Sequence, residues 1–423
     1  MKILFLAHRT PYPPNKGDKI RSFHLLSQLA RSHDVTLLYF VDDPQDLNHT
    51  SILQSLCRGK VFPVRMNRCW AMCRAFLSLV RGRSFSEGFY AAKSFQRAVD
   101  DALRDGPFDA VFIFSSAIAS FAKNIKARIR IVDFVDVDSD KWGQLAEVMT
   151  FPLSILYRIE QRRLLRLEVE ISHWATWNLF VSLADAELFK NRGGMGNIEV
   201  LPNGTDLELR RLPLDQMPFH GVGIHGTEEF DGPKLIFIGT MNYYPNVDAV
   251  HYFVKQIFPL IRQKFPRAVF EVVGRYPPRS VRRLSKLDGV RVLGEVPDIR
   301  SFLIRADISV APMRIARGVQ TKVLEAMGMG VPVVATQAAT QGIDVCDGQE
   351  VLTGRSPVEF ASQVTKLLSD AELRKSITKK AWNKMKQVYN WEISGAKLER
   401  LLNSAPAKQS PESKDAEVSM SQG

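Results

Sequence analysis

Hydrophobic and polar residues follow two alternating patterns along the chain. Short continuous apolar runs predict buried β-strands, and the stretches between most of them, with apolar residues three or four positions apart, predict helices. In the first half, the strand-like runs are residues 2–8, 35–41, 60–64, 110–114, 129–134, 179–183 and 198–201. This alternation predicts an α/β domain built on one doubly wound parallel sheet.

A second alternating series begins at residue 235, with the strand-like runs LIFIG, AVFEVVG, VRVLG, DISVAP and PVVAT. The carboxyl ends of parallel strands meet along one edge of a sheet. We therefore expect the residues at these ends to line one crevice, namely Gly239, Gly274, Gly294, Pro312 and the loop around Arg317.

Two domains are also expected from the length, because 423 residues exceed what one ordinary core supports. We place the first domain at residues 1–213 and the second at 233–385. Residues 214–232 lack clear periodicity and are interpreted as the linker. Residues 386–403 are expected to be helical and to pack back on the first domain. The polar residues 404–423 are expected to be a disordered tail.

The composition is that of a globular protein, with 45% hydrophobic and 24% charged residues. No run approaches the roughly 18 consecutive apolar residues that span a bilayer. Four cysteines, at positions 57, 69, 73 and 346, show neither metal-ligand spacing nor a disulfide framework, which fits a reducing compartment. These features predict a cytoplasmic protein, soluble or peripheral at the inner face of the plasma membrane.

The formal charge of +12 implies attraction to an acidic partner, which nucleic acid, anionic lipid or a phosphorylated small molecule would satisfy. Two basic, amphipathic stretches lie at residues 70–83 and 154–171. The first sets five apolar or weakly polar residues against Arg74 and Arg81; these are Trp70, Cys73, Phe76, Leu77 and Val80. We interpret both as helices that cover the sheet, with a membrane-binding surface as the alternative.

The stretch from Arg314 to Thr336 carries the clearest chemistry. A loop with Gly318 leads into a helix that holds Lys322 and Glu325, and a helix start behind a glycine loop suits an anionic ligand. A carboxylate accepts two hydrogen bonds from a vicinal diol, so a ribose at Glu325 would leave its diphosphate near Lys322. The structural alternative is a first-turn glutamate stabilised by the helix dipole or paired with Lys322.

Residues 316–336 resemble the donor-binding segment of family 4 glycosyltransferases. Further segments agree in order: LPNGTD, FIGTMNYYPNVDAV, VVG, LGEVPDI and ADISVAPM. The resemblance implies a GT-B architecture, in which two Rossmann-like domains face a central crevice. It implies transfer of a sugar from a nucleotide-sugar donor to a glycan or polyprenyl-linked acceptor, with retention and without a metal or other cofactor. The segments RTPYPPNKGDKIR and DFVDVDSDKW resemble transferases of exopolysaccharide clusters associated with exosortase systems.

By this resemblance, Glu325 corresponds to the second glutamate of the family's Glu-x7-Glu motif, which holds the ribose. Arg317 stands where the first glutamate is expected, and the family's basic residues after the first donor-domain strand are absent between Thr240 and Asn246. We infer that Arg317 and Lys322, with Arg314, stabilise the departing diphosphate instead. The complete expected donor set is Glu325, Gly318, Val319, Gln320, Thr321, Gly239, Thr240, Gly274 and Arg314.

On the acceptor side, Gly17 precedes a helix that Asp18 is expected to cap, but no G-x-G-x-x-G follows, which argues against a dinucleotide. We expect Arg21, with Lys19, to reach an acceptor phosphate; a solvated helix face is the alternative. His8 lies at the end of the first strand, where it is either a site residue or a loop histidine whose hydrogen bonds are already made. His24 is expected to pack against the apolar face of its helix.

Asp136 and Asp138 follow the strand at 129–134 and are expected to orient the acceptor hydroxyl. Helix capping and pairing with Lys141 are the alternative. Asp-x-Asp is also typical of metal binding in the other major glycosyltransferase fold, GT-A, but the doubly wound first domain disfavours it.

Three other classes of function remain open from the sequence. A GT-B nucleotide-sugar epimerase shares the expected fold, although LPNGTD and residues 317–325 look more like transferases. A nucleic-acid-binding protein would explain the charge, but aromatic and basic residues are not interleaved as in such proteins, so we expect no nucleic-acid partner. A non-catalytic scaffold is the third, because the first motif glutamate is missing.

Overall fold

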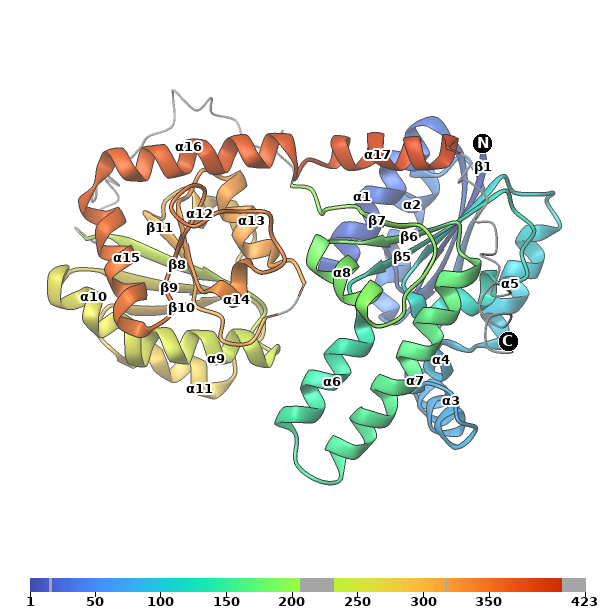
Figure 1. Ribbon diagram of the computed structural model, residues 1–423, viewed down its shortest axis with the longest axis horizontal. Coiled ribbons are helices and arrows are strands. Elements are labelled where there is room, and N and C mark those ends of the chain that lie inside the picture. Colours follow the sequence, from blue (N-terminus) through green and yellow to red (C-terminus); the bar gives the residue numbers. More distant parts are fainter. Residues whose placement is uncertain (15–16, 206–231, 317, 405–423) are drawn as a thin grey trace, which may run out of the picture.

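The computed structural model describes residues 1–14, 17–205, 232–316 and 318–404. Most of the expected linker and tail, and Arg317, lie outside the described residues. Two α/β domains stand side by side, each built on a parallel sheet (Figure 1). The expected class, two Rossmann-like domains on parallel sheets, is confirmed.

The first domain contains a seven-stranded sheet in the order β3-β2-β1-β4-β5-β6-β7. Its strands are β1 (Lys2–Ala7), β2 (Asp34–Val41), β3 (Val61–Arg65), β4 (Ala110–Phe114), β5 (Ile129–Val135), β6 (Trp177–Phe180) and β7 (Ile198–Val200). In the middle, Ile3 of β1 is in register with Val35 of β2 and Ala110 of β4. Both faces of β1 are buried, which explains why its residues form a continuous apolar run.

The second domain contains a six-stranded sheet in the order β10-β9-β8-β11-β12-β13. Its strands are β8 (Lys234–Ile238), β9 (Val269–Val273), β10 (Val290–Gly294), β11 (Ile308–Ala311), β12 (Val333–Ala335) and β13 (Leu352–Thr353). The chain order reverses between β8 and β11, and ligands bind open α/β sheets beyond the strand ends at such a point.

Helices cover both faces of each sheet. In the first domain they are α1 (Gly17–Ser32), α2 (Thr50–Leu56), α3 (Arg68–Val80), α4 (Phe85–Tyr90), α5 (Lys93–Leu103), α6 (Asp138–Val148), α7 (Leu153–Trp174) and α8 (Leu183–Asn191). The remaining helices are α9 (Tyr244–Tyr252), α10 (Phe258–Lys264), α11 (Arg279–Arg282), α12 (Arg300–Leu303), α13 (Thr321–Gly328), α14 (Gln337–Thr340), α15 (Pro357–Ser369), α16 (Ala371–Gln387) and α17 (Trp391–Asn403). Among the described residues, no helix is both long enough and apolar enough to cross a bilayer.

The chain returns to the first domain through α16 and α17, which run along one side of the molecule (Figure 1). The ring of Trp391 in α17 stacks on His24 of α1 with centroids 4.5 Å apart. Ser394 donates a hydrogen bond to the carbonyl of Pro202, and Arg128 donates one to the carbonyl of Leu402. The last helix is therefore part of the first domain's packing.

Helix α3 does not cover the sheet in the way we expected. Its buried residues are the small Ala71, Ala75 and Ser78, while Trp70 and Val80 are exposed. The spacing of large apolar residues predicts a helix, but small residues pack closer to the domain, so the large ones face outward.

Candidate functional site

The donor side of the candidate site is centred on α13, which follows the Gly318 loop. Val323, Leu324, Ala326 and Met327 of this helix are buried in the second domain's core. The 3.6-residue period then leaves Lys322 and Glu325, three positions apart, together on the partly exposed side. The expected proximity of these two charges follows directly from the helix.

Lys322 is held in place by neighbouring polar groups. Its Nζ donates to Oδ1 of Asn246 over 2.8 Å and to Oε1 of Gln320 over 3.3 Å, and it lies 5.2 Å from the centre of the Phe237 ring. Burial lowers the pKa of Lys322 to about 8, an effect that the nearby Glu325 opposes. The ammonium is therefore easier to deprotonate than an ordinary lysine, and an anionic ligand would restore its charge.

Asn246 is a site residue that we did not assign from the sequence. It is buried in the first turn of α9, and its Nδ2 donates to the carbonyl of Thr240 over 2.9 Å while Oδ1 accepts from Lys322. A Cβ at Gly239 would lie 2.8 Å from this Nδ2, and one at Gly274 would lie 1.8 Å from the carbonyl oxygen of Gly239. Both glycines are thus needed for the close approach of β8, β9 and α9.

The carboxylate of Glu325 forms no hydrogen bond or ion pair with any other described residue, whereas its backbone carbonyl accepts a hydrogen bond from the N–H of Met329. Burial raises the pKa of its carboxyl to about 7, although Lys322 opposes the change. Two opposite charges thus sit close together, each destabilised by burial and not joined by an ion pair. A ligand that offers hydroxyl donors and an anion would satisfy both groups.

Arg314 is paired with a carboxylate of α9. Its Nε donates to Oδ2 of Asp248 over 3.0 Å, its Nη2 donates to the same carboxylate, and its guanidinium lies 4.9 Å from the centre of the Tyr252 ring. These contacts join the guanidinium to α9, and its contact with a diphosphate stays a prediction. The proposed partner Arg317 lies outside the described residues.

The loop before α13 approaches the first domain. Gly318 has a φ of +61°, which favours glycine, and a Cβ at this position would lie only 3.1 Å from Oδ2 of Asp136. The other expected donor residues lie alongside: Val319 packs on the core, Gln320 precedes α13 and Thr321 begins it. The structure thus brings together the donor loop and the acceptor-side aspartate.

Asp136 lies between β5 and α6, Asp138 begins α6, and the two carboxylates share one cation. Nζ of Lys141 is 2.6 Å from Oδ1 of Asp136 and 3.1 Å from Oδ1 of Asp138. Burial raises the pKa of Asp136 to about 6, although Lys141 lowers it. Val135, just before, has a φ of +70°, which is strained for a β-branched residue. The pairing that we gave as the structural alternative is present, and it places both carboxylates at the domain junction.

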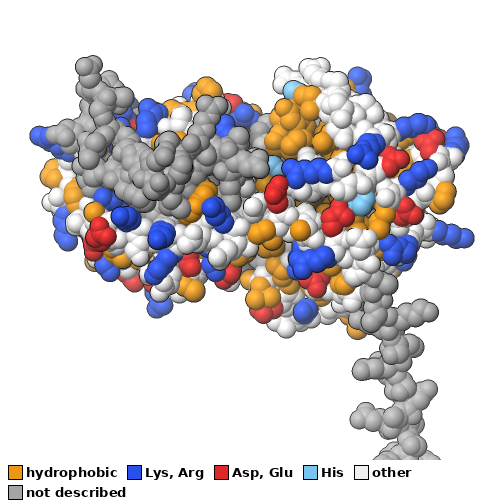
Figure 2. Space-filling model, turned by 90° about the horizontal axis from the view of Figure 1, so that it is seen from above, with side chains coloured by type: hydrophobic (Ala, Val, Ile, Leu, Met, Phe, Trp, Pro, Cys, Tyr) orange, Lys and Arg blue, Asp and Glu red, His pale blue; other side chains and the backbone are white. Residues whose placement is uncertain are grey.

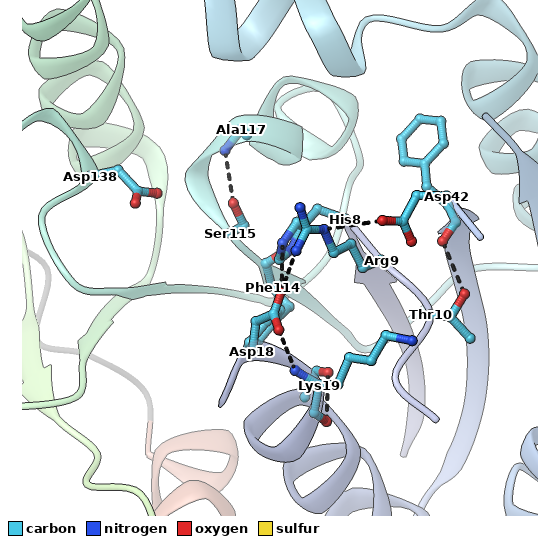
Figure 3. Close-up of polar contacts among 12 residues, drawn as sticks. His8, Arg9, Thr10, Asp18, Lys19, Asp42, Phe114, Ser115, Ala117 and Asp138 are labelled. Carbon is cyan, nitrogen blue, oxygen red and sulfur yellow. Dashed lines mark hydrogen bonds and ion pairs between the residues drawn. The ribbon is translucent and has the colours of Figure 1, made fainter. Parts of the chain in front are cut away.

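Polar residues around the end of β1 form a second cluster, shown in Figure 3. Nδ1 of His8 lies 3.4 Å from the carbonyl oxygen of Phe114, and Nε2 lies 3.8 Å from Oδ2 of Asp18. Burial lowers the pKa of His8, against the opposing effect of Asp18. Arg9 donates to Asp18 over 2.9 Å. Helix α1 begins at Gly17, and Asp18 lies in its first turn instead of before it.

Two basic residues expected at an acceptor phosphate lie elsewhere. Arg21 is fully buried; it donates to both carboxylate oxygens of Asp133 over 2.8 and 3.0 Å, and to the carbonyl of Leu201 and Oδ1 of Asn203. Lys19 is buried in an ion pair with Asp46, 2.7 Å apart. We expected Arg21 at the crevice because the helix start is there, but its long side chain extends inward and joins β5 to the segment after β7.

The architecture that the two sheets and their junction define is the GT-B fold, and solved structures support this. HepE from Anabaena, solved in complex with UDP, superposes with a TM-score of 0.66 over 95% of this chain and 100% of that one, at 15% sequence identity. Residues 232–370 match the family model described as glycosyl transferases group 1. This segment contains Asn246, Lys322 and Glu325.

Curated relatives match over part of their length. An uncharacterised glycosyltransferase of Methanocaldococcus jannaschii is 27% identical over 223 residues, which is 49% of this chain and 56% of the relative. Glycosyltransferase 1 domain-containing protein 1 of Xenopus tropicalis is 22% identical over 148 residues, 33% of this chain and 43% of the relative. The matches thus span about half the length of these relatives. Together with the family match, they support glycosyl transfer.

Proposed function

We propose that this protein transfers a sugar, as a hexosyltransferase-type enzyme of family 4, from a nucleotide-diphosphate donor to a hydroxyl of a glycan or lipid-linked acceptor. The anomeric configuration is retained and no metal takes part. The reaction takes place in the cytoplasm and contributes to exopolysaccharide synthesis, as the resemblance of the segments around residues 9–21 and 133–142 implies.

The observation that carries this proposal is the carboxylate of Glu325, which has no ion-pair partner among the described residues, beside the Lys322 ammonium. A ribose would donate hydroxyl hydrogen bonds to Glu325, and its diphosphate would then lie by Lys322 at the start of α13, where backbone N–H groups also favour an anion. HepE, which shares the fold, was solved with UDP and with UDP-glucose. A nucleotide sugar is therefore the donor class that we propose.

Most of the rate enhancement of sugar transfer would come from stabilising the charge on the leaving diphosphate and from positioning the acceptor hydroxyl. As the bond to the leaving diphosphate breaks, Lys322 would offset the developing negative charge. Asp136, close to the Gly318 loop, would orient the acceptor hydroxyl from the opposite domain. Each role requires the two domains to meet at this junction.

Thermal unfolding in the presence of nucleotide sugars tests the proposal, because a ligand that binds only the folded state raises its stability. We expect a rise in Tm with at least one UDP- or GDP-sugar, lost in Glu325→Ala. Product anomeric configuration, read by NMR, then tests retention. An unchanged Tm with every nucleotide sugar at millimolar concentration would contradict the proposal.

Variants of Arg317 test whether this residue stabilises the leaving diphosphate in place of the basic residues that the family carries after the first donor-domain strand. With this arginine in place of the motif glutamate, we expect Arg317→Ala to lower turnover strongly, while Arg314→Ala has a smaller effect because Arg314 is paired with Asp248. Intact turnover in Arg317→Ala, together with abolished turnover in Glu325→Ala, would show that the charge has not moved to residue 317.

A further inference from the structure

Large apolar side chains gather on two projections of the first domain. On α3 they are Trp70, Met72, Phe76, Leu77 and Val80; on the α6–α7 hairpin they are Leu145, Met149, Phe151, Leu153 and Ile155. The exposed fractions reach 67% at Trp70, 78% at Phe151 and 85% at Val80. Scattered apolar residues are normal at a surface, but a concentration of this size indicates an interaction site. We call these ten residues the apolar flank.

The two projections extend from the domain in the same direction (Figure 1), and polar contacts fix them to one another. Glu160 of α7 accepts hydrogen bonds from Oγ of Ser84 over 2.7 Å and from the N–H of Ser86 over 2.9 Å at the start of α4. Arg163 donates to the carbonyl of Arg83 over 3.1 Å. The apolar flank is therefore one supported surface and not two independent arms.

Charge indicates what covers this surface. Residues 65–90 contain five arginines and a single acidic residue, Glu87. Within the described part of the chain, Arg81 on the α3 side and Arg158, Arg162 and Arg166 on α7 form no ion pair. The face that carries α16 and α17 also bears many basic side chains, with acidic ones among them on α17 (Figure 2). Aromatic and aliphatic residues bordered by unpaired arginines fit the boundary between the head groups and acyl chains of an anionic bilayer.

We propose that the apolar flank docks this protein on the surface of an anionic lipid bilayer. Trp70, Phe76 and Phe151 enter the head-group region, and the arginines contact lipid phosphates. The binding itself is independent of sugar transfer. The placement of a lipid-linked acceptor, however, rests on the proposed function. Helix α6 begins at Asp138 in the candidate site and runs 11 residues to the hairpin, which is about 16 Å at 1.5 Å per residue.

Flotation of the full chain with vesicles tests the docking. We expect binding to vesicles that contain phosphatidylglycerol, weak binding to phosphatidylcholine alone, and release as salt rises. The variant Phe76→Ser, Val80→Ser, Phe151→Ser should lower the partition coefficient by roughly tenfold or more. Its matched control, Leu287→Ser, Val358→Ser, Ile393→Ser, changes exposed apolar residues elsewhere and should bind as the parent does.

The arginines are tested in the same assay. Arg81→Ser, Arg158→Ser, Arg162→Ser should weaken binding by roughly tenfold or more, since each cation near the membrane contributes. The control Arg279→Ser, Arg283→Ser, Lys286→Ser removes the same charge from the second domain and should have little effect. Equal losses in variants and controls, or no vesicle binding by the parent chain, would overturn the proposal. The proposal would also be overturned if the parent chain formed a dimer and bound no vesicles, and if the serine variant of the apolar flank were a monomer. Donor binding is measured in the same variants by the Tm shift with nucleotide sugars. A shift that persists while vesicle binding is lost shows that the membrane proposal and the transfer proposal are tested separately.

Discussion

Nζ of Lys322 in α13 donates a hydrogen bond to Oδ1 of Asn246 in α9 over 2.8 Å, while Nδ2 of the same amide donates to the carbonyl of Thr240. Asn246 thus fixes the direction of the ammonium that is proposed to face the diphosphate. Its role is to position Lys322, since it contacts no proposed reacting atom.

Replacing Asn246 by alanine should weaken donor binding. A hydrogen bond to a charged group contributes about 2 kcal/mol, so the KM for the nucleotide sugar should rise roughly tenfold or more. Asn246→Asp keeps an acceptor for Lys322 and adds a charge that raises the lysine pKa, so it should retain more affinity than the alanine variant. Steady-state kinetics of both variants check this. Equal losses in the two would indicate a structural effect of the buried amide instead.

The pH dependence of nucleotide binding should follow Glu325 and Lys322. An ionised carboxylate accepts diol hydrogen bonds with both oxygens and more strongly than a protonated carboxyl does, so affinity should rise as the pH passes the Glu325 pKa of about 7. It should fall again above about 8, where Lys322 loses its proton. Isothermal titration between pH 5.5 and 9 measures both limbs.

Glu325→Gln removes the group responsible for the acid limb. This variant should bind more weakly than the parent and should show no gain in affinity between pH 6 and 7. The limb that follows Lys322 should remain but move to a lower pH, because the Glu325 carboxylate no longer raises the pKa of the lysine. An acid limb that persists in Glu325→Gln would assign the titration to another group, with Asp136 the first to consider because burial raises its pKa to about 6.

The sequence predicted those features that local periodicity determines. Continuous apolar runs gave the strands of both sheets except β13, which is only two residues long, since strands buried on both faces leave no polar positions. Lys322 and Glu325 were expected together because residues three apart share a helix face. Both predictions depend on neighbours within a few residues along the chain.

Contacts between distant segments were not predictable in the same way. Arg21 and Asp133 are 112 residues apart in sequence, and nothing in either local pattern indicates that they meet. The contact of Asn246 with Lys322 likewise requires α9 and α13 to be placed by the sheet. For α3, periodicity identified an apolar stripe but did not say which stripe faces inward; the small residues Ala71 and Ala75 decided that.

Breaking the Arg21–Asp133 ion pair by removing one partner should strongly destabilise the first domain. Asp133→Ala leaves a buried guanidinium without its counter-ion, and removing one partner of such a pair costs about 3 to 5 kcal/mol. The exposed pair Lys60–Asp105 provides the control, since Asp105→Ala should cost about 1 kcal/mol or less. Denaturant unfolding measures both. Similar costs for the two would show that the buried pair contributes no more than a surface pair.

Gly318 tests whether the two domains must approach each other at Asp136. In Gly318→Ala the new Cβ meets Oδ2 of Asp136 at 3.1 Å, so either the carboxylate or the loop must shift. Gly348 is a matched control, because its φ of +76° carries a similar penalty for alanine while its Cβ would meet nothing within 4 Å. Both alanine variants should lose about 1 to 2 kcal/mol of stability from the left-handed backbone.

Only Gly318→Ala should also lose transfer, by roughly severalfold in kcat/KM, because the Asp136 carboxylate must give way at a junction where positioning supports the reaction. Adding Asp136→Ala to Gly318→Ala discriminates further. If the clash with the carboxylate causes the loss, the double variant should transfer as well as Asp136→Ala alone. Should Gly318→Ala and Gly348→Ala reduce transfer equally, the effect would come from backbone strain, and the approach of Gly318 to Asp136 would have no part in the reaction.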